Sequence, residues 1–203
     1  QVAALLTSQI AAISTTQAPY LSTAQAAAFS TAQAVAIETV DLARLDEPTV
    51  EALGTTNIKA LTTAQIASLT DRQIQGLSTA SIAVLTTAQI VSLETNQVAA
   101  LSTAQIAGLN TAQTAALETT DLVVLTSTQL AGLSTTNLAA LKTSQIAALT
   151  TAQANGLSTS QIAALTTSQT QAVTTADLLT LSTSQINALG TANAAVLTTA
   201  QIA

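Results

Sequence analysis

The chain has 203 residues, of which 48% are hydrophobic and 7% are charged, and its formal net charge is −6. Its only basic residues are Arg44, Lys59, Arg72 and Lys142, too few for a phosphate-binding surface, so we expect no nucleic-acid partner. The chain lacks Cys and His, and no apolar run approaches the length of a membrane-spanning helix. Disulfides, thiolate metal sites and a helical membrane span are therefore excluded.

A large apolar residue recurs at every eighth position from Leu5 to Leu197. Numbered from this residue, the octad has the consensus Leu-[Ser/Thr]-Thr-x-Gln-[Ile/Leu]-x-[Ala/Gly], in about 25 copies. A fixed period is typical of repeat proteins whose units pack on their neighbours. We therefore predict a single repeat array over residues 1–203. Because Gln1 stands at position five and Ala203 at position seven, we expect an excerpt of a longer array.

The octad favours very short helices over one long helix or a strand. In a straight helix the Leu would rotate by about 80° per octad, and in a strand positions one and six would face opposite ways. Thr at position three and the small polar residues at position two both suit a helix N-cap. If position two is the cap, Gln at position five completes a capping box. Pro48 after Glu47 suits a first helical residue.

Whether position three or position two is the cap, a helix begins at the Thr. This predicts an all-α solenoid of very short capped helices, one per octad. Position eight is small except at residues such as Tyr20 and Arg44, and we expect it to let neighbouring turns approach. The alternative is a β-solenoid with 16-residue coils, whose corners usually need Gly, Asn or Asp, although the chain has only six Gly.

A substitution pattern at position five bears on the coil length. Asp replaces Gln at Asp41, Asp121 and Asp177, and Asn follows two octads later at Asn57, Asn137 and Asn193. This spacing suggests that two octads complete one coil.

We predict no catalytic, cofactor-binding or metal-binding residues, and no enzyme activity, because no base, phosphate loop or ligand spacing is present. One acidic cluster departs from the repeat and comprises Glu38, Asp41, Asp46, Glu47 and Glu51. It suits either a Ca²⁺ ion or, as we favour, the capping of helix starts. The Gln at position five could read a ligand, but we favour bonds to the backbone of their own or the adjacent turn.

Rows of Thr and Ser on a solenoid also resemble the surfaces that ice-binding proteins present to ice. Two features argue against this function. A Thr at position three that caps a helix would turn inward, and the charged residues Glu38, Glu94, Glu118 and Lys142 interrupt position two.

The stretches Leu101-Ser-Thr-Ala-Gln-Ile-Ala-Gly and Leu61-Thr-Thr-Ala-Gln-Ile-Ala-Ser resemble the octapeptide-repeat regions of large bacterial surface or secreted, adhesin-like proteins. The resemblance implies an extracellular or cell-surface location. We therefore expect a structural rod: a stalk, a spacer, or a fibre or sheath segment that self-associates with identical or neighbouring arrays. Few charges oppose such contacts. A ligand-binding or ice-binding solenoid is the alternative.

Overall fold

The computed structural model describes residues 2–202, which are all-α, with 24 short α-helices, two 3₁₀ helices and no strand. The predicted all-α class is thus confirmed, and the β-solenoid alternative is wrong. The chain divides into two compact units, Gln1–Leu101 and Ser102–Ala203. Each unit is described by itself.

The first unit contains two 3₁₀ helices, η1 and η2, and eleven α-helices within its described residues. Their bounds are η1 Val2–Ala4, α1 Thr7–Ala11, η2 Ala18–Tyr20, α2 Thr23–Ala27, α3 Thr31–Ala36, α4 Thr39–Leu42, α5 Glu47–Ala52, α6 Gly54–Ala60, α7 Thr63–Ser68, α8 Asp71–Gly76, α9 Thr79–Ala83, α10 Thr87–Val91 and α11 Thr95–Ala100.

The second unit contains thirteen α-helices within its described residues. Their bounds are α12 Thr103–Ala107, α13 Thr111–Ala116, α14 Thr119–Val124, α15 Ser127–Ala131, α16 Thr135–Ala139, α17 Thr143–Ala147, α18 Thr151–Asn155, α19 Thr159–Ala163, α20 Thr167–Ala172, α21 Thr175–Leu178, α22 Thr183–Ala188, α23 Gly190–Ala194 and α24 Thr199–Ile202.

Position two is the N-cap in most octads, and Thr at position three is the first helical residue. Before α7, for example, Thr62 is extended and its hydroxyl accepts a hydrogen bond from Gln65 N at 3.1 Å. The capping-box register is therefore confirmed, and the alternative with Thr at position three as the cap is wrong. Pro48 is consequently the second residue of α5, behind the cap Asp46, and not the first. That place still leaves an N–H unpaired within the helix, so Pro is tolerated there.

Two extended residues separate several pairs of consecutive helices. Between α7 and α8 these are Leu69, with φ −63° and ψ 140°, and Thr70, with φ −73° and ψ 159°. Two octads use another link, in which Gly54 and Gly190 have φ of +78° and +70°. Other residues rarely adopt this left-handed conformation, so position two is glycine where a single residue separates α5 from α6 and α22 from α23.

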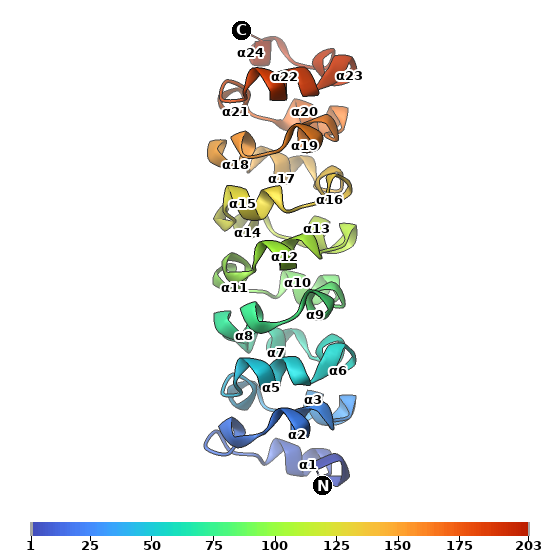
Figure 1. Ribbon diagram of the computed structural model, residues 1–203, viewed down its shortest axis with the longest axis vertical. Coiled ribbons are helices and arrows are strands. Elements are labelled where there is room, and N and C mark those ends of the chain that lie inside the picture. The colour runs from blue at the N-terminus through green and yellow to red at the C-terminus, as the bar shows by residue number, and fades with distance from the viewer. Residues whose placement is uncertain (1, 203) are drawn as a thin grey trace. The chain divides into compact units, whose positions relative to one another are not determined.

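Each helix packs on the third helix along the chain in the regular part of each unit. In the first unit α2 packs on α5, α5 on α8 and α8 on α11, and in the second α12 packs on α15, α15 on α18 and α18 on α21. Figure 1 shows these helices stacked in successive layers of each unit. One coil therefore comprises three octads, and the expected two-octad coil is wrong.

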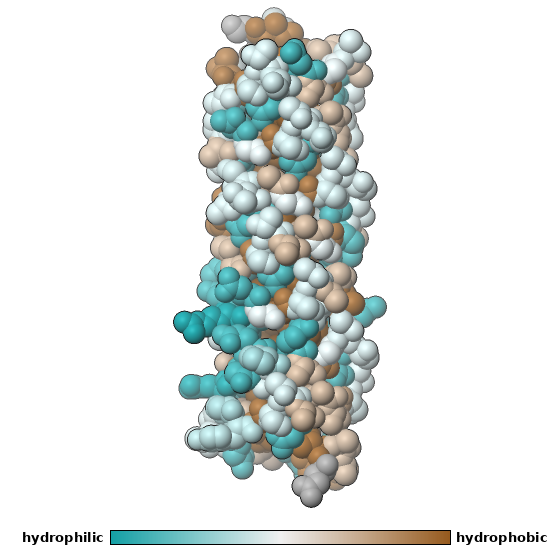
Figure 2. Space-filling model, viewed as in Figure 1, coloured by the Kyte–Doolittle hydropathy of each residue, from teal (hydrophilic) through white to brown (hydrophobic). Residues whose placement is uncertain are grey.

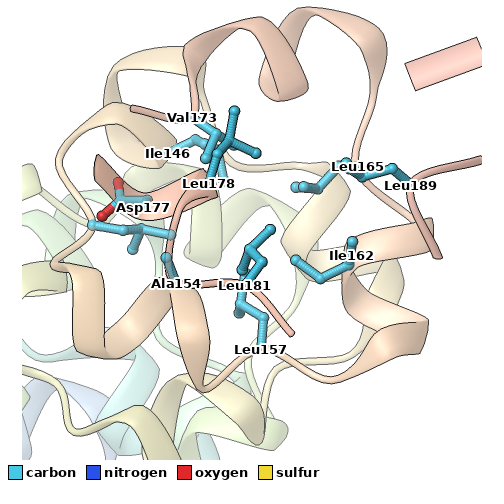
Figure 3. Close-up of a pocket in the computed structure, with 11 residues that line it drawn as sticks. Ile146, Ala154, Leu157, Ile162, Leu165, Val173, Asp177, Leu178, Leu181 and Leu189 are labelled. Atoms are coloured by element: carbon cyan, nitrogen blue, oxygen red, sulfur yellow. The ribbon is translucent and has the colours of Figure 1, made fainter. Parts of the chain in front are cut away.

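Leu at position one and the apolar residue at position six fill the inside of the coils. In the first unit Ile66 and Ile74 are fully buried, and Leu69 and Leu77 are 3% exposed. In the second unit Ala154 takes the place of a larger residue at position six. A cavity of about 10 Å³ lies beside it, lined by apolar side chains that include Leu157, Leu178 and Leu181. Figure 3 shows these side chains gathered together, with Asp177 at the edge of the cluster.

Small residues at position eight allow the coils to approach, as predicted. A Cβ added to Gly76 would lie 2.7 Å from Glu47 Cβ, and one added to Gly132 would lie 2.8 Å from Thr103 Cγ2. In both pairs the partner is at position three of an octad in the preceding coil. The exception Tyr20 has space because its side chain is 85% exposed.

Candidate functional site

The side chains at position five run from Gln9 to Gln201, and we call them the position-five row. From Gln33 onward, members of the row lie at junctions between coils. Gln73 illustrates the geometry. Its Oε1 accepts a hydrogen bond from Thr70 N at 2.8 Å, and its Nε2 donates to the carbonyl oxygens of Leu42 and Leu45 at 2.9 and 2.7 Å. One buried amide thus completes the cap of α8 and binds carbonyls at the end of α4, one coil earlier.

The same bond recurs along both units, always to the carbonyl oxygen 28 residues earlier in the chain. It joins Gln33 to Leu5, Gln65 to Ile37 and Gln89 to Leu61 in the first unit, and Gln145 to Leu117, Gln153 to Leu125, Gln161 to Leu133, Gln169 to Leu141, Gln185 to Leu157 and Gln201 to Val173 in the second, at 2.7–2.9 Å. Short helices leave backbone N–H groups unpaired at their starts and C=O groups unpaired at their ends. The Gln amide bonds to both, since its oxygen accepts from an N–H and its nitrogen donates to a C=O. The predicted bonds of Gln to backbone are confirmed.

Other donors replace Gln at this position and keep the bond to the earlier coil. Asn57 Nδ2 donates to Phe29 O at 2.8 Å, Asn193 Nδ2 to Leu165 O at 2.9 Å and Thr49 Oγ1 to Leu21 O at 3.2 Å. The Asn side chains therefore keep this inter-coil bond and do not indicate a two-octad coil.

At position five the Gln oxygen accepts a hydrogen bond from the N–H of the cap residue, and the Ser81 side chain is too short to do so. A side chain from the preceding coil accepts this bond instead. Glu51 Oε2 accepts hydrogen bonds from Ser81 Oγ at 2.8 Å and from Ser78 N at 3.0 Å. A carboxylate oxygen therefore takes the place of the missing Gln oxygen at the start of α9. The pattern alone could not reveal this pair, because its members belong to different coils.

The acidic cluster is divided among several structural roles. Asp46 caps α5, where its Oδ1 accepts a hydrogen bond from Thr49 N at 2.9 Å, and Glu51 supports α9 as described. Across residues 2–202, no three acidic, His or Cys side chains come together in a group suited to a metal ion. The structure therefore does not bring the members of the cluster together as such a group, and the capping interpretation is confirmed for Asp46.

The hydroxyl-bearing positions two to four lie on the outside of the coils. In the second unit one continuous stack, α12, α15, α18, α21 and α24, carries no charge at these positions. We call residues 102–104, 126–128, 150–152, 174–176 and 198–200 the uncharged strip. Thr103, Thr151 and Thr175 are exposed within it, so Thr at position three does not turn inward. Glu118 and Lys142 cap α14 and α17, which belong to a different stack.

Charge is unevenly distributed between the units. Ten of the fourteen charged residues lie before residue 102, and the second unit has only Glu118, Asp121, Lys142 and Asp177. On the face shown in Figure 2, the strongly hydrophilic residues accordingly gather over the first unit, and the surface of the second is mostly of intermediate hydropathy.

None of the helices within residues 2–202 has the length and apolar character needed to cross a lipid bilayer. Capped octads, three to a coil and joined by the position-five row, define a repeat protein with a helical, solenoid-like arrangement.

The family model described as the ALTTAQ repeat matches residues 34–71, 90–120, 114–151 and 171–203. These matches cover well over half of the chain, which therefore belongs to the ALTTAQ repeat family. The six letters correspond to residues 60–65 and 148–153, from position eight of one octad to position five of the next. Comparison with curated proteins and with solved structures finds no match.

Proposed function

We propose that this chain is a structural repeat segment of a bacterial surface or secreted protein, which serves as a stalk, a spacer or part of a self-assembling fibre. The position-five row carries the proposal. It repeats one inter-coil contact along the regular part of each unit. Repeat proteins gain stability from such nearest-neighbour contacts and can be extended unit by unit.

The surface supports the self-associating form of this function. The uncharged strip presents Thr, Ser and Ala side chains, and no exposed charge on it would repel a second copy. The strip is the surface that we expect in contacts between arrays. An extracellular or cell-surface location rests on the resemblance to repeat regions of adhesin-like proteins.

Electron microscopy of the purified chain over a range of concentrations tests this proposal. We expect thin rods that join side by side into ordered fibres as the concentration rises. Compact globules at all concentrations would refute both the rod and the fibre.

A matched pair of variants tests the contact surface. Thr151→Lys and Thr175→Lys place charges on the uncharged strip, and Thr143→Lys places one on the stack that already carries Lys142. The two strip variants are expected to remain as single rods, and the Thr143 variant is expected to form fibres as the unmodified chain does. Equal fibre formation by all three would exclude the strip as the contact.

Ice binding is the second candidate function, because the Thr side chains at position three are exposed on an uncharged surface. Part of this surface is already engaged, since Ser127 Oγ donates to Ala152 O at 2.8 Å and Thr175 Oγ1 donates to Ala200 O at 3.3 Å. Thermal hysteresis is the decisive measurement. This function requires hysteresis that Thr151→Lys abolishes and Thr143→Lys leaves intact, whereas its absence from the unmodified chain rules the function out.

A further inference from the structure

Asp41 belongs to the position-five row but lacks the donor group that most members of the row carry. Gln73, Asn57 and Thr49 differ in length and chemistry, yet each donates a hydrogen bond to the carbonyl 28 residues earlier. An ionised carboxylate cannot do so, because it only accepts hydrogen bonds. Asp41 stands at this position in α4, and the residue 28 places earlier is Ile13, whose carbonyl the spacing of the row assigns to it.

The Asp41 side chain is buried without a complete set of partners. It is 2% exposed, and its Oδ1 has no hydrogen-bond partner. Leaving a buried polar atom unpaired is costly, and leaving a charged one unpaired is costlier. Such an atom in a row of donors indicates that the carboxyl group does not act as an ordinary carboxylate.

The residue that caps α4 explains why Asp41 differs from Asp177. Asp177 Oδ2 accepts a hydrogen bond from the hydroxyl of its own cap, Thr174, at 2.6 Å. The cap of α4 is Glu38, which has no hydroxyl and makes no side-chain cap bond. Asp41 thus lacks the donor that serves Asp177 and lies beside a second acidic group.

We propose that Asp41 carries a proton in the folded chain and donates it to the Ile13 carbonyl, so that the packing of octad 37–44 on octad 13–20 depends on pH. The neutral carboxyl then donates a hydrogen bond to a carbonyl of the preceding coil, as the amide does elsewhere in the row. Loss of the proton replaces a donor with a buried negative charge, and the first coil separates more readily from the second.

The electrostatic surroundings agree with this assignment. Burial, and secondarily the charge of Glu38, raises the pKa of Asp41 above its ordinary value. Helix α7, which packs on α4, has no titratable residue, and octad 13–20 has only the exposed Tyr20. The nearest basic residue in the chain, Arg44, is exposed. A raised carboxyl pKa contributes stability at low pH, and that contribution is lost as the pH rises through the pKa of the folded state.

Asp41→Asn is the variant that tests the proposal, since Asn57 shows that an Asn at position five makes the inter-coil bond. Amide hydrogen exchange of residues 10–20 is compared at the same pH in the two proteins, which cancels the intrinsic pH dependence of exchange. Relative to the variant, protection in the unmodified chain is expected to fall by up to about tenfold for each pH unit above the raised pKa. Asp177→Asn, the matched control, is expected to show no such change in residues 10–20.

The side-chain carbon of Asp41, followed by NMR in the unmodified chain, gives a second measurement that requires no variant. We expect it to titrate above the ordinary range of an aspartate. The proposal is overturned if Asp41 titrates at an ordinary or lower pH, or if the protection ratio stays constant from about pH 4 to about pH 8.

Discussion

At the scale of the residue, two neighbouring hydroxyl side chains of the octad have different structural roles. Thr62 caps α7 with its side chain, whereas Thr63 is the first helical residue and is exposed. The two residues are chemically identical and adjacent, so they allow a direct comparison of the two positions.

Thr62→Ala is expected to lower the free energy of unfolding by about 1 kcal/mol, because it removes the acceptor for Gln65 N. Thr63→Ala is expected to change it by less than about 0.5 kcal/mol, as is usual for an exposed position. Urea titration of both variants gives the comparison. A larger loss at Thr63 would mean that position three is the cap after all.

The packing between coils depends most on the residue at position five. Gln73→Leu removes the partners of Thr70 N and of the Leu42 and Leu45 carbonyls, and we expect a loss of about 2–4 kcal/mol in urea titration. Gln25 is the matched control, since its Oε1 accepts a hydrogen bond from Ser22 N at 2.8 Å and the position 28 residues earlier falls outside the 203-residue sequence used in the measurement. Gln25→Leu should therefore cost less, and equal losses would show that the inter-coil bond adds little.

At the scale of the element, a single helix turn is too short to be stable alone, so its stability depends on the fit between coils. The cavity beside Ala154 is a local defect in that fit, because most octads carry Ile, Leu or Val at position six. Apart from Asp177, the residues that line the cavity are apolar.

Ala154→Ile restores the common residue and is expected to raise the free energy of unfolding by about 1–2 kcal/mol through burial of added methyl groups. Ala152→Ile, on the exposed side of α18, is the control and should have little effect. Thermal unfolding of the two variants measures the difference. A lower melting temperature for Ala154→Ile would mean that the neighbours leave no room for the larger side chain.

At the scale of the whole molecule, the sequence was sufficient for the features that are local. The spacing of Leu, Thr and Gln within one octad predicted one capped helix per repeat, because caps and helix starts depend on residues that are close along the chain. It also predicted that the Gln amides bind backbone and that small residues at position eight admit a neighbour, as Gly76 and Gly132 do.

The number of octads per coil could not be obtained in this way. It depends on contacts between residues far apart in the chain, and each octad presents the same pattern whichever neighbour it meets. Asn57 and Asn193 misled the prediction because each replaces Gln and keeps its bond to the carbonyl 28 residues earlier, so their spacing does not report the coil length. The burial of Asp41 was missed for the same reason, because the octad pattern does not show which residues of other coils lie beside position five.

The three-octad coil is the central claim, and engineered disulfides test it most directly because the chain has no Cys. A Cβ at Gly132 would lie 2.8 Å from Thr103 Cγ2, which is close enough for a disulfide after a small adjustment. The pair Thr103→Cys and Gly132→Cys tests a three-octad coil. The pair Thr103→Cys and Val124→Cys places the same two octad positions one two-octad coil apart. Under mild oxidation and thiol counting by mass spectrometry, we predict rapid closure of the first pair and none of the second. Closure of the second pair instead of the first would contradict the three-octad coil.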